Sequence, residues 1–563
     1  MSHSPGNIIL DFSGHIHNLG DLQTQLGLAG HNLQSTLQAA WLRWGTSLAE
    51  HLVGDYALAI QDETQRLTYL ARDALGVKPL YYRIDNGRLS HGFSIPELRR
   101  CCPLPVTADM DWAAAYMLKL SFSQTETAYK EIHKLAPGHW LTCNADGHVR
   151  IQRYHEWRDD APAATKRDPR WIEAYREVLE EAIRCRMDPD APMGTENSGG
   201  IDSATITAYL AHFLGEPGDR LHSFGFAYCE QEPAYILETS QASRIVHNYI
   251  LTRWMADDEA VSLGLNTLGY PQEHPNSTGH ISFYRECKLR GIHALFSGFG
   301  GDEVVTHSGH HLRKELLDGG HYAALWNILP GGPFKRSLRL LKTAALGRTN
   351  SAYTSAFLKA CKQRWPHQLL RPEVVLRLNL YERYMETARY DAPYRRINDF
   401  ILQHHLQRME LTARLEDCTL MASAYGVDYR WPLWDSRLVQ QYLSTPGIEK
   451  VGPKGIGRYL HRRAIDGIVP KRITWKTEKD MGENYQLKNI NRHIAQISEL
   501  GRQLDGNLHP GLAELIDRDK FRQQIKQTEL IPANDIRHRL SMRNISHIHW
   551  LNRWLHHNDN ISG

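Results

Sequence analysis

Residues 198–203, with the sequence SGGIDS, have the composition of a phosphate-binding loop. Two adjacent glycines let the backbone turn tightly and approach a ligand closely. Ser198 and Ser203 add hydroxyl donors, and the helical pattern that follows presents unpaired N–H groups at its start. Asp202 would repel phosphate, but a Mg²⁺ ion that bridges carboxylate and phosphate oxygens removes this conflict. The segment therefore predicts a site for phosphate groups and Mg²⁺.

A second segment, residues 294–303, has the sequence ALFSGFGGDE. An apolar run of strand length ends in a glycine-rich turn that carries two acids. One interpretation is an acidic helix start, where Asp and Glu stabilise the helix dipole. The other is a second Mg²⁺ carboxylate, Asp302, that faces Asp202.

The elements around these loops alternate between helix and strand. Residues 171–186 have helical apolar spacing, and residues 221–226 read as a strand. Such alternation predicts an α/β domain with a parallel sheet and helices on both faces. Ligands bind outside the carboxyl ends of these strands, which suits a loop that follows the first strand. Residues 192–197 are expected to form that strand, although Glu196 and Asn197 are polar for a buried one.

The first 155 residues have a different pattern. Short apolar runs, such as residues 8–10, 56–60 and 67–70, are separated by turn residues, which predicts an α+β domain in which sheet predominates. A polar, Ala/Pro-rich linker follows at residues 159–168. We therefore expect two domains, at residues 1–160 and 170–563.

Composition limits the possible functions. The chain has 563 residues, 42% of them hydrophobic and 23% charged, as in an ordinary globular protein. A net charge of +3 gives no reason to expect nucleic acid, and we expect no membrane span and no signal peptide. Eight scattered cysteines without a CxxC pair favour a reducing cytoplasm. Two histidine pairs, at residues 310–311 and 404–405, are expected on the surface, and a basic run at residues 335–348 forms either a solvated face or a contact with a charged partner.

The loop at residues 198–203 resembles the pyrophosphate loop of ATP pyrophosphatases and is not a Walker loop. Residues 54–60, 70–82 and 294–303 are similar to asparagine synthetases, so the resemblance extends over nearly the whole chain. It implies that ATP is cleaved between its α- and β-phosphates, with Mg²⁺, to adenylate a carboxylate. By this resemblance the pyrophosphate is held by Ser198, Gly199, Gly200 and Ser203, and the metal by Asp202 and Asp302.

The resemblance also implies further site residues. Phe224, Ser297 and Gly298 would line the nucleotide. Asp428 stands where the family has a glutamate before its RxPFLD segment, and it would orient an amine or accept its proton, although a surface acid that caps a turn is the alternative. The family's essential lysine aligns with Lys479, and Lys476 remains the alternative, because the spacing from Pro470 is ambiguous.

The first domain resembles a class II (Ntn-type) glutaminase but departs from it where catalysis requires a match. Such a glutaminase needs a cysteine directly after the initiator Met, whereas this chain has Ser2. The strand that should carry the nucleophile is missing. Ser13 and His15 replace the Asn and Glu that hold glutamine in the family. We interpret the domain as a non-hydrolytic remnant.

A ligase of this family without an ammonia supply must use an amine of its own substrate. The resemblance thus points to enzymes that close a lactam, and the SGFGGDE segment with Asp428 favours a lasso peptide macrolactam cyclase. Alternatives are a β-lactam or carbapenam synthetase, a divergent asparagine synthetase, or an inactive binding scaffold. The expected partners are a peptide or amino-acid-derived substrate, a leader-peptide-binding protein and a maturation protease.

Overall fold

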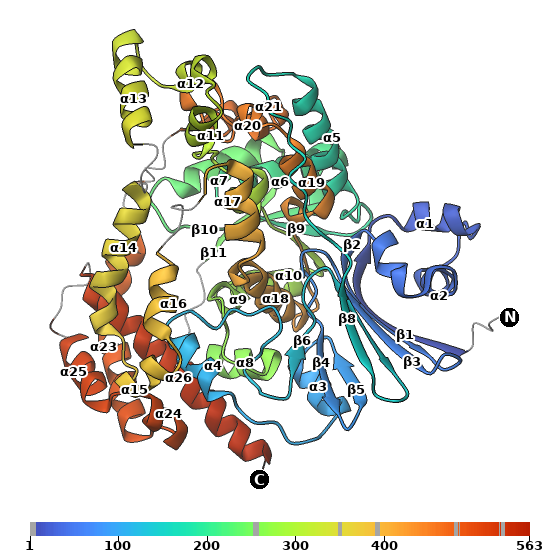
Figure 1. Cartoon of the computed structure of the whole chain (residues 1–563), viewed down its shortest axis with the longest axis vertical. Helices are drawn as coiled ribbons and strands as arrows, with labels where there is room; N and C mark the ends of the chain where they lie inside the picture. Colours follow the sequence, from blue (N-terminus) through green and yellow to red (C-terminus); the bar gives the residue numbers. More distant parts are fainter. Residues whose placement is uncertain are drawn as a thin grey trace.

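The first domain is built on a five-stranded antiparallel sheet with the order β1-β2-β3-β7-β8 (Figure 1). The computed structural model describes residues 7–251, 258–346, 352–388, 394–477, 482, 485–528, 530 and 535–562. The strands are β1 (Ile8–Ile16), β2 (Gly54–Asp62), β3 (Leu67–Arg72), β7 (His139–Asn144) and β8 (Val149–Arg153). This confirms the sheet-rich domain that the short apolar runs predict.

Both faces of this sheet are covered, so residues 56–60 in the middle of β2 are apolar without interruption. Leu58 and Ile60 pack under helices α1 (Leu19–Leu26) and α2 (Leu33–Trp44). Ala57 and Ala59 face the other side, where a small sheet lies with the order β5-β4-β6. Its strands are β4 (Tyr81–Asp85), β5 (Arg88–Gly92) and β6 (His133–Lys134), and helices α3 (Ile95–Cys101) and α4 (Met110–Met117) follow β5 in the chain.

The second domain has a five-stranded sheet with the order β11-β10-β9-β12-β13, in which all neighbouring strands are parallel. The strands are β9 (Met193–Glu196), β10 (Leu221–Phe226), β11 (His247–Leu251), β12 (Ala294–Phe296) and β13 (Asp428–Arg430). The helices between them include α5 (Arg170–Arg184), α6 (Ile201–Leu214), α7 (Glu232–Ala242), α8 (Asp258–Leu268), α9 (Asn276–Gly279) and α10 (Ile281–Leu289). The predicted parallel α/β domain is confirmed, and β9 forms in spite of its polar Glu196.

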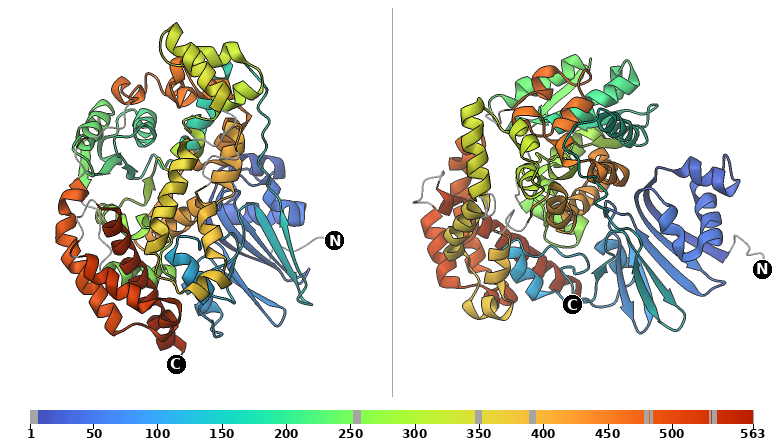
Figure 2. Two further views of the ribbon diagram at one scale, coloured as in Figure 1. Left: turned by 60° about the vertical axis from the view of Figure 1, so that its left-hand side comes forward. Right: turned by 45° about the horizontal axis from the view of Figure 1, so that its top comes forward.

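Helices make up most of the chain after β12 (Figure 2). Those that the site and the surface depend on are α11 (Leu312–Asp318), α12 (Tyr322–Ile328), α13 (Pro333–Leu346), α14 (Ala352–Arg364), α15 (Pro372–Arg377), α16 (Leu380–Glu386), α17 (Ile397–Phe400), α18 (Glu410–Ser423), α19 (Ser436–Ser444), α20 (Gly447–Lys450), α21 (Tyr459–Ala464) and α22 (Lys471–Thr474). The last four are α23 (Tyr485–Gly506), α24 (Pro510–Leu515), α25 (Arg518–Thr528) and α26 (Ile536–Ser562). In α26, Trp554 donates a hydrogen bond to the Tyr129 hydroxyl at 3.0 Å, so the end of the chain packs back onto the first 160 residues.

The segment expected to be a linker is held in place. Asp159 accepts hydrogen bonds from Arg396 and Asn398, both at 2.5 Å. The backbone of Arg158 bonds the side chain of Gln440. This stretch therefore connects the domains as an ordered strap along the second domain.

A buried ionic network joins the two domains at Glu416 of α18. Arg72, the last residue of β3, donates to Glu416 Oε1 at 2.6 Å, and Lys134 of β6 donates to Oε2 at 3.1 Å. All three side chains are buried. Burial would raise the pKa of Glu416, but Lys134 and Arg72 outweigh it and lower that pKa. The carboxylate of the second domain thus depends on cations that only the first domain supplies.

We expect Glu416→Gln to destabilise the protein by about 3 kcal/mol or more, because it leaves the buried Arg72 without a charge partner and Lys134 with only Glu273, 4.0 Å away. Thermal and denaturant unfolding would measure this loss. Glu156→Gln is the control: Glu156 is 73% exposed and pairs with Arg153 at 3.6 Å, so the change should stay within about 0.5 kcal/mol. Equal unfolding curves for the two variants would show that this ionic network does not contribute to the stability of the protein.

Candidate active site

The phosphate loop lies at the carboxyl end of the central strand β9 and leads into α6. Gly199 has a φ of +69°, and a Cβ atom there would lie 2.5 Å from the Cβ of Tyr235, so only glycine suits this position. The Ser198 backbone N–H donates to Ser203 Oγ at 3.1 Å. No side chain caps α6 at Gly200, so the N–H groups of its first turn remain available to an anion.

The loop after β12 packs directly against this one, because β9 and β12 are neighbouring parallel strands. A Cβ atom on Gly298 would lie 2.5 Å from the backbone nitrogen of Ser203. One on Gly301 would lie 2.6 Å from Cγ of Asp202. Glycine at these two positions therefore lets the second loop approach the first closely enough to bring their carboxylates together.

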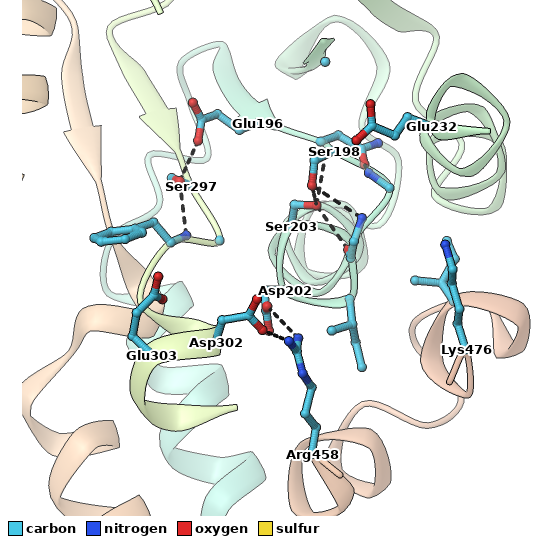
Figure 3. Close-up of a pocket in the computed structure, with 18 of the residues that line it drawn as sticks. Glu196, Ser198, Asp202, Ser203, Glu232, Ser297, Asp302, Glu303, Arg458 and Lys476 are labelled. Atoms are coloured by element: carbon cyan, nitrogen blue, oxygen red, sulfur yellow. Dashed lines mark hydrogen bonds and ion pairs between the residues drawn. The ribbon is translucent and has the colours of Figure 1, made fainter. Parts of the chain in front are cut away.

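Asp202 and Asp302 share one cationic partner, Arg458 (Figure 3). Arg458 Nη1 lies 3.0 Å from Asp202 Oδ2, and its Nη2 pairs with Asp302. The hydroxyl of Thr306 donates to Asp202 Oδ1 at 2.7 Å. The structure thus places the two predicted metal carboxylates next to each other, where they share a single positive charge.

This donor set suits Mg²⁺ in chemical type, because both side chains offer carboxylate oxygens. Within the described residues no group of three or more His, Cys, Asp or Glu side chains is arranged to hold a metal by itself. Mg²⁺ usually takes one or two protein carboxylates and completes its shell with phosphate oxygens and water. Asp202 and Asp302 would hold the ion, and the ion would neutralise phosphate charge beside them.

The two loops open into a cavity of about 1060 Å³. Its lining includes every residue predicted to bind phosphate or nucleotide, namely Ser198, Gly199, Gly200, Asp202, Ser203, Phe224, Ser297, Gly298 and Asp302. It also includes five cationic side chains, those of Arg414, Lys454, Arg458, Arg462 and Lys476. Five carboxylates, those of Glu196, Asp202, Glu232, Asp302 and Glu303, balance them. Cations together with carboxylates that could hold Mg²⁺ suit a polyphosphate ligand that carries a metal ion.

Lys476 lies at this cavity, and Lys479 lies outside the described residues. The ammonium of Lys476 sits 3.7 Å from the centre of the Tyr235 ring, and its backbone carbonyl accepts a hydrogen bond from Arg462 at 2.9 Å. The structure therefore places Lys476 at the predicted nucleotide site, and the role of Lys479 stays a prediction.

Glu196 adds a buried carboxylate to the cavity wall, which sequence reasoning treated only as an odd residue in a strand. It accepts from Ser297 Oγ at 2.6 Å, lies 2.9 Å from His280 Nδ1, and bonds the Tyr429 hydroxyl. Burial would raise its pKa, but the charge and hydrogen bond of His280 lower it to about 2. Glu196 is therefore an anion at neutral pH and faces the cavity.

The structure places Asp428 away from this cavity, which corrects its predicted role. Asp428 is the first residue of β13, so it lies at the edge of the sheet opposite to the loops. Its carboxylate bonds Lys78 Nζ and His15 Nε2, both at 2.8 Å, and Arg430 Nε at 2.7 Å. These contacts surround a separate cavity of about 240 Å³ between the domains. Similarity in sequence could not tell which end of a three-residue strand faces the ligand.

A second chamber, of about 460 Å³, adjoins the first. The two share Phe299, Asp302, Glu303, Ser308, Arg414 and Arg458 as lining residues. The remaining wall is rich in histidine, because His307, His310, His404 and His405 line it. The expectation that both histidine pairs lie on the surface was wrong for His311 and His404, which are buried, whereas His310 is exposed and His405 is half-buried. Both pairs gather around Phe400.

Two histidines of this chamber are poor bases. Burial, reinforced by His310, lowers the pKa of His307 well below its ordinary value. Burial, reinforced by Arg408, lowers that of His405 to about 4. These two rings are therefore uncharged at neutral pH, and they offer aromatic surface with hydrogen-bonding nitrogens.

Sequence reasoning did not indicate three cationic residues of the cavity wall, Arg458, Lys454 and Arg414. Lys454 and Arg458 lie in residues 452–458, GPKGIGR, and both have a φ of +58°, a region that non-glycine residues rarely adopt. A basic segment interrupted by three glycines was the available signal. Arg414 had none, because its position on α18 depends on the packing of that helix, where it lies 3.8 Å over the Phe299 ring.

A model of the asparagine synthase family matches residues 174–556. The chain belongs to the asparagine synthase family. A second model, described as a glutamine amidotransferase domain, matches residues 1–155. The second domain is thus that of an ATP-dependent carbon–nitrogen ligase, and the first has the amidotransferase fold. The asparagine synthase match covers both loops, α18 and Lys476.

Two asparagine synthetases align over most of the chain, and an amidase aligns over about half of it. Asparagine synthetase [glutamine-hydrolyzing] 3 of Bacillus subtilis is 29% identical over 543 residues, which cover 92% of this chain and 81% of that protein. Asparagine synthetase [glutamine-hydrolyzing] 1 of the same organism is 23% identical over 82% of this chain and 73% of its own length. Amidase chry2 of Gibberella zeae is 26% identical over 47% of this chain and 41% of its own.

We expect Lys476→Ala to lower the turnover rate by about a hundredfold or more, as for the loss of a preorganised charge at a site where negative charge develops. Single-turnover product formation at saturating ATP would measure the effect. Lys471→Ala, at an exposed position in the same segment, is the control and should stay near normal. If Lys479→Ala is inactive while Lys476→Ala is not, the acting cation is Lys479.

We expect the stability difference between wild type and Glu196→Gln to depend on pH. A carboxylate whose folded pKa is about 2, against an ordinary 4.5, stabilises the fold above pH 4.5 and loses this effect as pH falls toward 2. The difference should therefore shrink by about 2 kcal/mol between pH 7 and pH 3. Denaturant titrations at several pH values would measure it. A constant difference would mean that Glu196 is not held as an anion.

Proposed function

We propose that this member of the asparagine synthase family is an AMP-forming ligase that closes a lactam within one peptide substrate. The loop at residues 198–203 and the start of α6 would hold the β- and γ-phosphates of ATP. The substrate carboxylate would attack the α-phosphorus, which forms an acyl-adenylate and releases pyrophosphate. An amine of the same substrate would then attack the acyl carbon, with AMP as the leaving group. Lys476 and Arg458 lie where they would stabilise the negative charge of both steps.

The observation that carries the choice of substrate is the second chamber. A cavity of about 1060 Å³ already reaches the size that a drug-sized ligand fills. The adjoining chamber adds about 460 Å³ and starts at Asp302 and Glu303, next to the proposed metal carboxylates. A single aspartate would leave most of this space empty. Its wall combines histidine rings with charged side chains such as Arg408 and Glu410, and this additional lined space supports a larger substrate, such as the folded core of a lasso peptide.

The first domain supports an amine that does not come from glutamine. Ser13 and His15 occupy the positions where the family holds glutamine, and His15 is engaged by Asp428 of the second domain at 2.8 Å. Ser2, which replaces the family's nucleophilic cysteine, lies outside the described residues. We infer that the domain no longer hydrolyses glutamine and serves to support α18 through Arg72 and Lys134.

The proton of the attacking amine needs an acceptor at the cavity. Glu196 is a carboxylate that lines the cavity, and its hydrogen bond with the Tyr429 hydroxyl holds it in position. Burial raises the pKa of Tyr429 well above its ordinary value, so this hydroxyl is neutral and can donate to Glu196. Glu196 takes the role that the sequence suggested for Asp428.

A second candidate is asparagine synthesis with glutamine as the ammonia source. The Bacillus subtilis relative named asparagine synthetase 3 favours it, since the similarity extends through both domains.

In the lactam proposal the chain works in the cytoplasm beside a leader-peptide-binding protein and a maturation protease. All eight cysteines are unpaired, as that compartment would keep them.

The test is to incubate the purified chain with ATP, Mg²⁺ and the precursor peptide encoded beside its gene, and separately with aspartate plus glutamine. We expect AMP and pyrophosphate in the first mixture only, with a peptide product that is lighter by one water. Formation of asparagine and glutamate in the second mixture would establish the second candidate. ADP and phosphate as products would contradict the pyrophosphate loop itself.

Asp202→Ala and Asp302→Ala should both abolish product and AMP formation, because each removes a charge that would hold Mg²⁺ beside the phosphates. Asp428→Asn is the matched control. The Asp428 carboxylate lies outside the cavity, so an Asp428→Asn variant that folds should retain AMP formation. An inactive but folded Asp428→Asn variant would restore the role that the sequence suggested.

A further inference from the structure

Helix α13 presents its most apolar residues to solvent. Phe334 is 76% exposed, Leu338 53% and Leu341 66%. These residues are four and three positions apart, so they form one stripe along the helix. Exposed large apolar side chains on a single face, rather than scattered over a surface, mark an interaction site. We call Phe334, Leu338 and Leu341 the α13 stripe.

The stripe points away from the rest of the molecule. The half-buried residues of α13 are Arg336, Leu340 and Thr343, which lie on its other face. Leu340 packs against the hydrophobic core. The helix lies at the periphery of the molecule beside α11 and α12 (Figure 1). It is therefore docked by one face and leaves the stripe on the outermost surface.

Cations accompany the stripe. Lys335, Arg339 and Lys342 are four and three positions apart and follow one edge of it. With Arg336, the helix carries four cations and no acid. Since the whole chain has a net charge of +3, the remaining residues sum to 3 − 4 = −1. The net positive charge of the chain is thus concentrated on α13, the same helix that carries the α13 stripe.

We propose that α13 binds the surface of a membrane that contains anionic lipids. A helix with an apolar stripe, basic residues at its edge and low net hydrophobicity lies in the plane of the lipid interface. The stripe would enter the boundary between headgroups and acyl chains. Lys335, Arg339 and Lys342 would reach anionic headgroups with their ends while their stems cover the stripe.

The stripe lies on the outward face of a helix at the periphery of the molecule, and this position favours a lipid surface over a groove in another protein. A flat, deformable apolar layer reaches all three residues at once, and it needs no matching shape. No helix in the described part of the chain is long and apolar enough to cross a bilayer, so the contact we propose is peripheral. It is reversible, because three apolar side chains and a few cations give only weak binding. This contact does not depend on the proposed reaction.

Co-sedimentation of the full chain with vesicles tests the proposal. One set of vesicles is phosphatidylcholine, and the other contains equal parts phosphatidylcholine and phosphatidylglycerol. At low salt we expect at least tenfold tighter binding to the second set, and we expect this preference to disappear at high salt. The combined variant Phe334→Ser/Leu338→Ser/Leu341→Ser should bind at least tenfold more weakly than wild type.

Two further variants separate the stripe from general surface effects. Leu289→Ser/Leu376→Ser removes two apolar residues that are 77% and 80% exposed at the end of α10 and on α15, and it should bind like wild type. Lys335→Gln/Arg339→Gln/Lys342→Gln should bind both vesicle sets equally weakly. The thermal unfolding midpoint of each variant should match wild type, because none of these side chains is buried.

Three results would overturn the proposal. The first is wild-type protein that stays in solution with both vesicle sets. The second is equal binding by wild type and the stripe variant. The third is a concentration-dependent dimer that the stripe variant abolishes while no vesicle binding is seen, which would make the stripe a contact between two copies of this chain.

Discussion

The carboxylate of Glu416 is the point on which both domains depend. It is fully buried, and a buried charge is tolerated only when opposite charges or hydrogen bonds surround it. Arg72 and Lys134 meet this need from the first domain. The first domain is therefore a structural requirement of the second, whether or not it acts on glutamine. The family relationship explains its presence, and the buried charge explains why the chain could not simply lose it.

Helix α18 connects this interface with the site. Glu416 faces the first domain, while Arg414, two residues earlier, lines both chambers and covers the Phe299 ring. Asp417 accepts hydrogen bonds from the Tyr270 hydroxyl and the His274 backbone, both at 2.8 Å. A displacement of α18 would move all of these groups together. The position of the cavity wall is thus set in part by contacts with the other domain.

The site itself follows from strand order. Two glycine-rich loops are about a hundred residues apart in the chain but leave neighbouring parallel strands at the same edge, so their carboxylates meet. Close approach is possible because Gly298 and Gly301 have no side chain to separate the loops. Arg458 then joins Asp202 and Asp302 from a third segment. Charge repulsion between the acids is relieved by a residue that neither loop contains.

Local sequence was enough to predict the two loops, the α/β domain and the sheet-rich first domain, because glycine pairs, acids and apolar periodicity act within a few residues. For the same reason it was enough to predict loop residues that line one cavity and the two carboxylates that lie side by side there. Only the tertiary structure decided which residues join them. Asp428 starts its strand and therefore faces the domain interface, whereas Glu196 ends its strand at the cavity. His310, His404 and His405 line one chamber only because segments about ninety residues apart in the chain come together around Phe400. Such placement depends on contacts between distant segments, which a pattern of neighbouring residues does not contain.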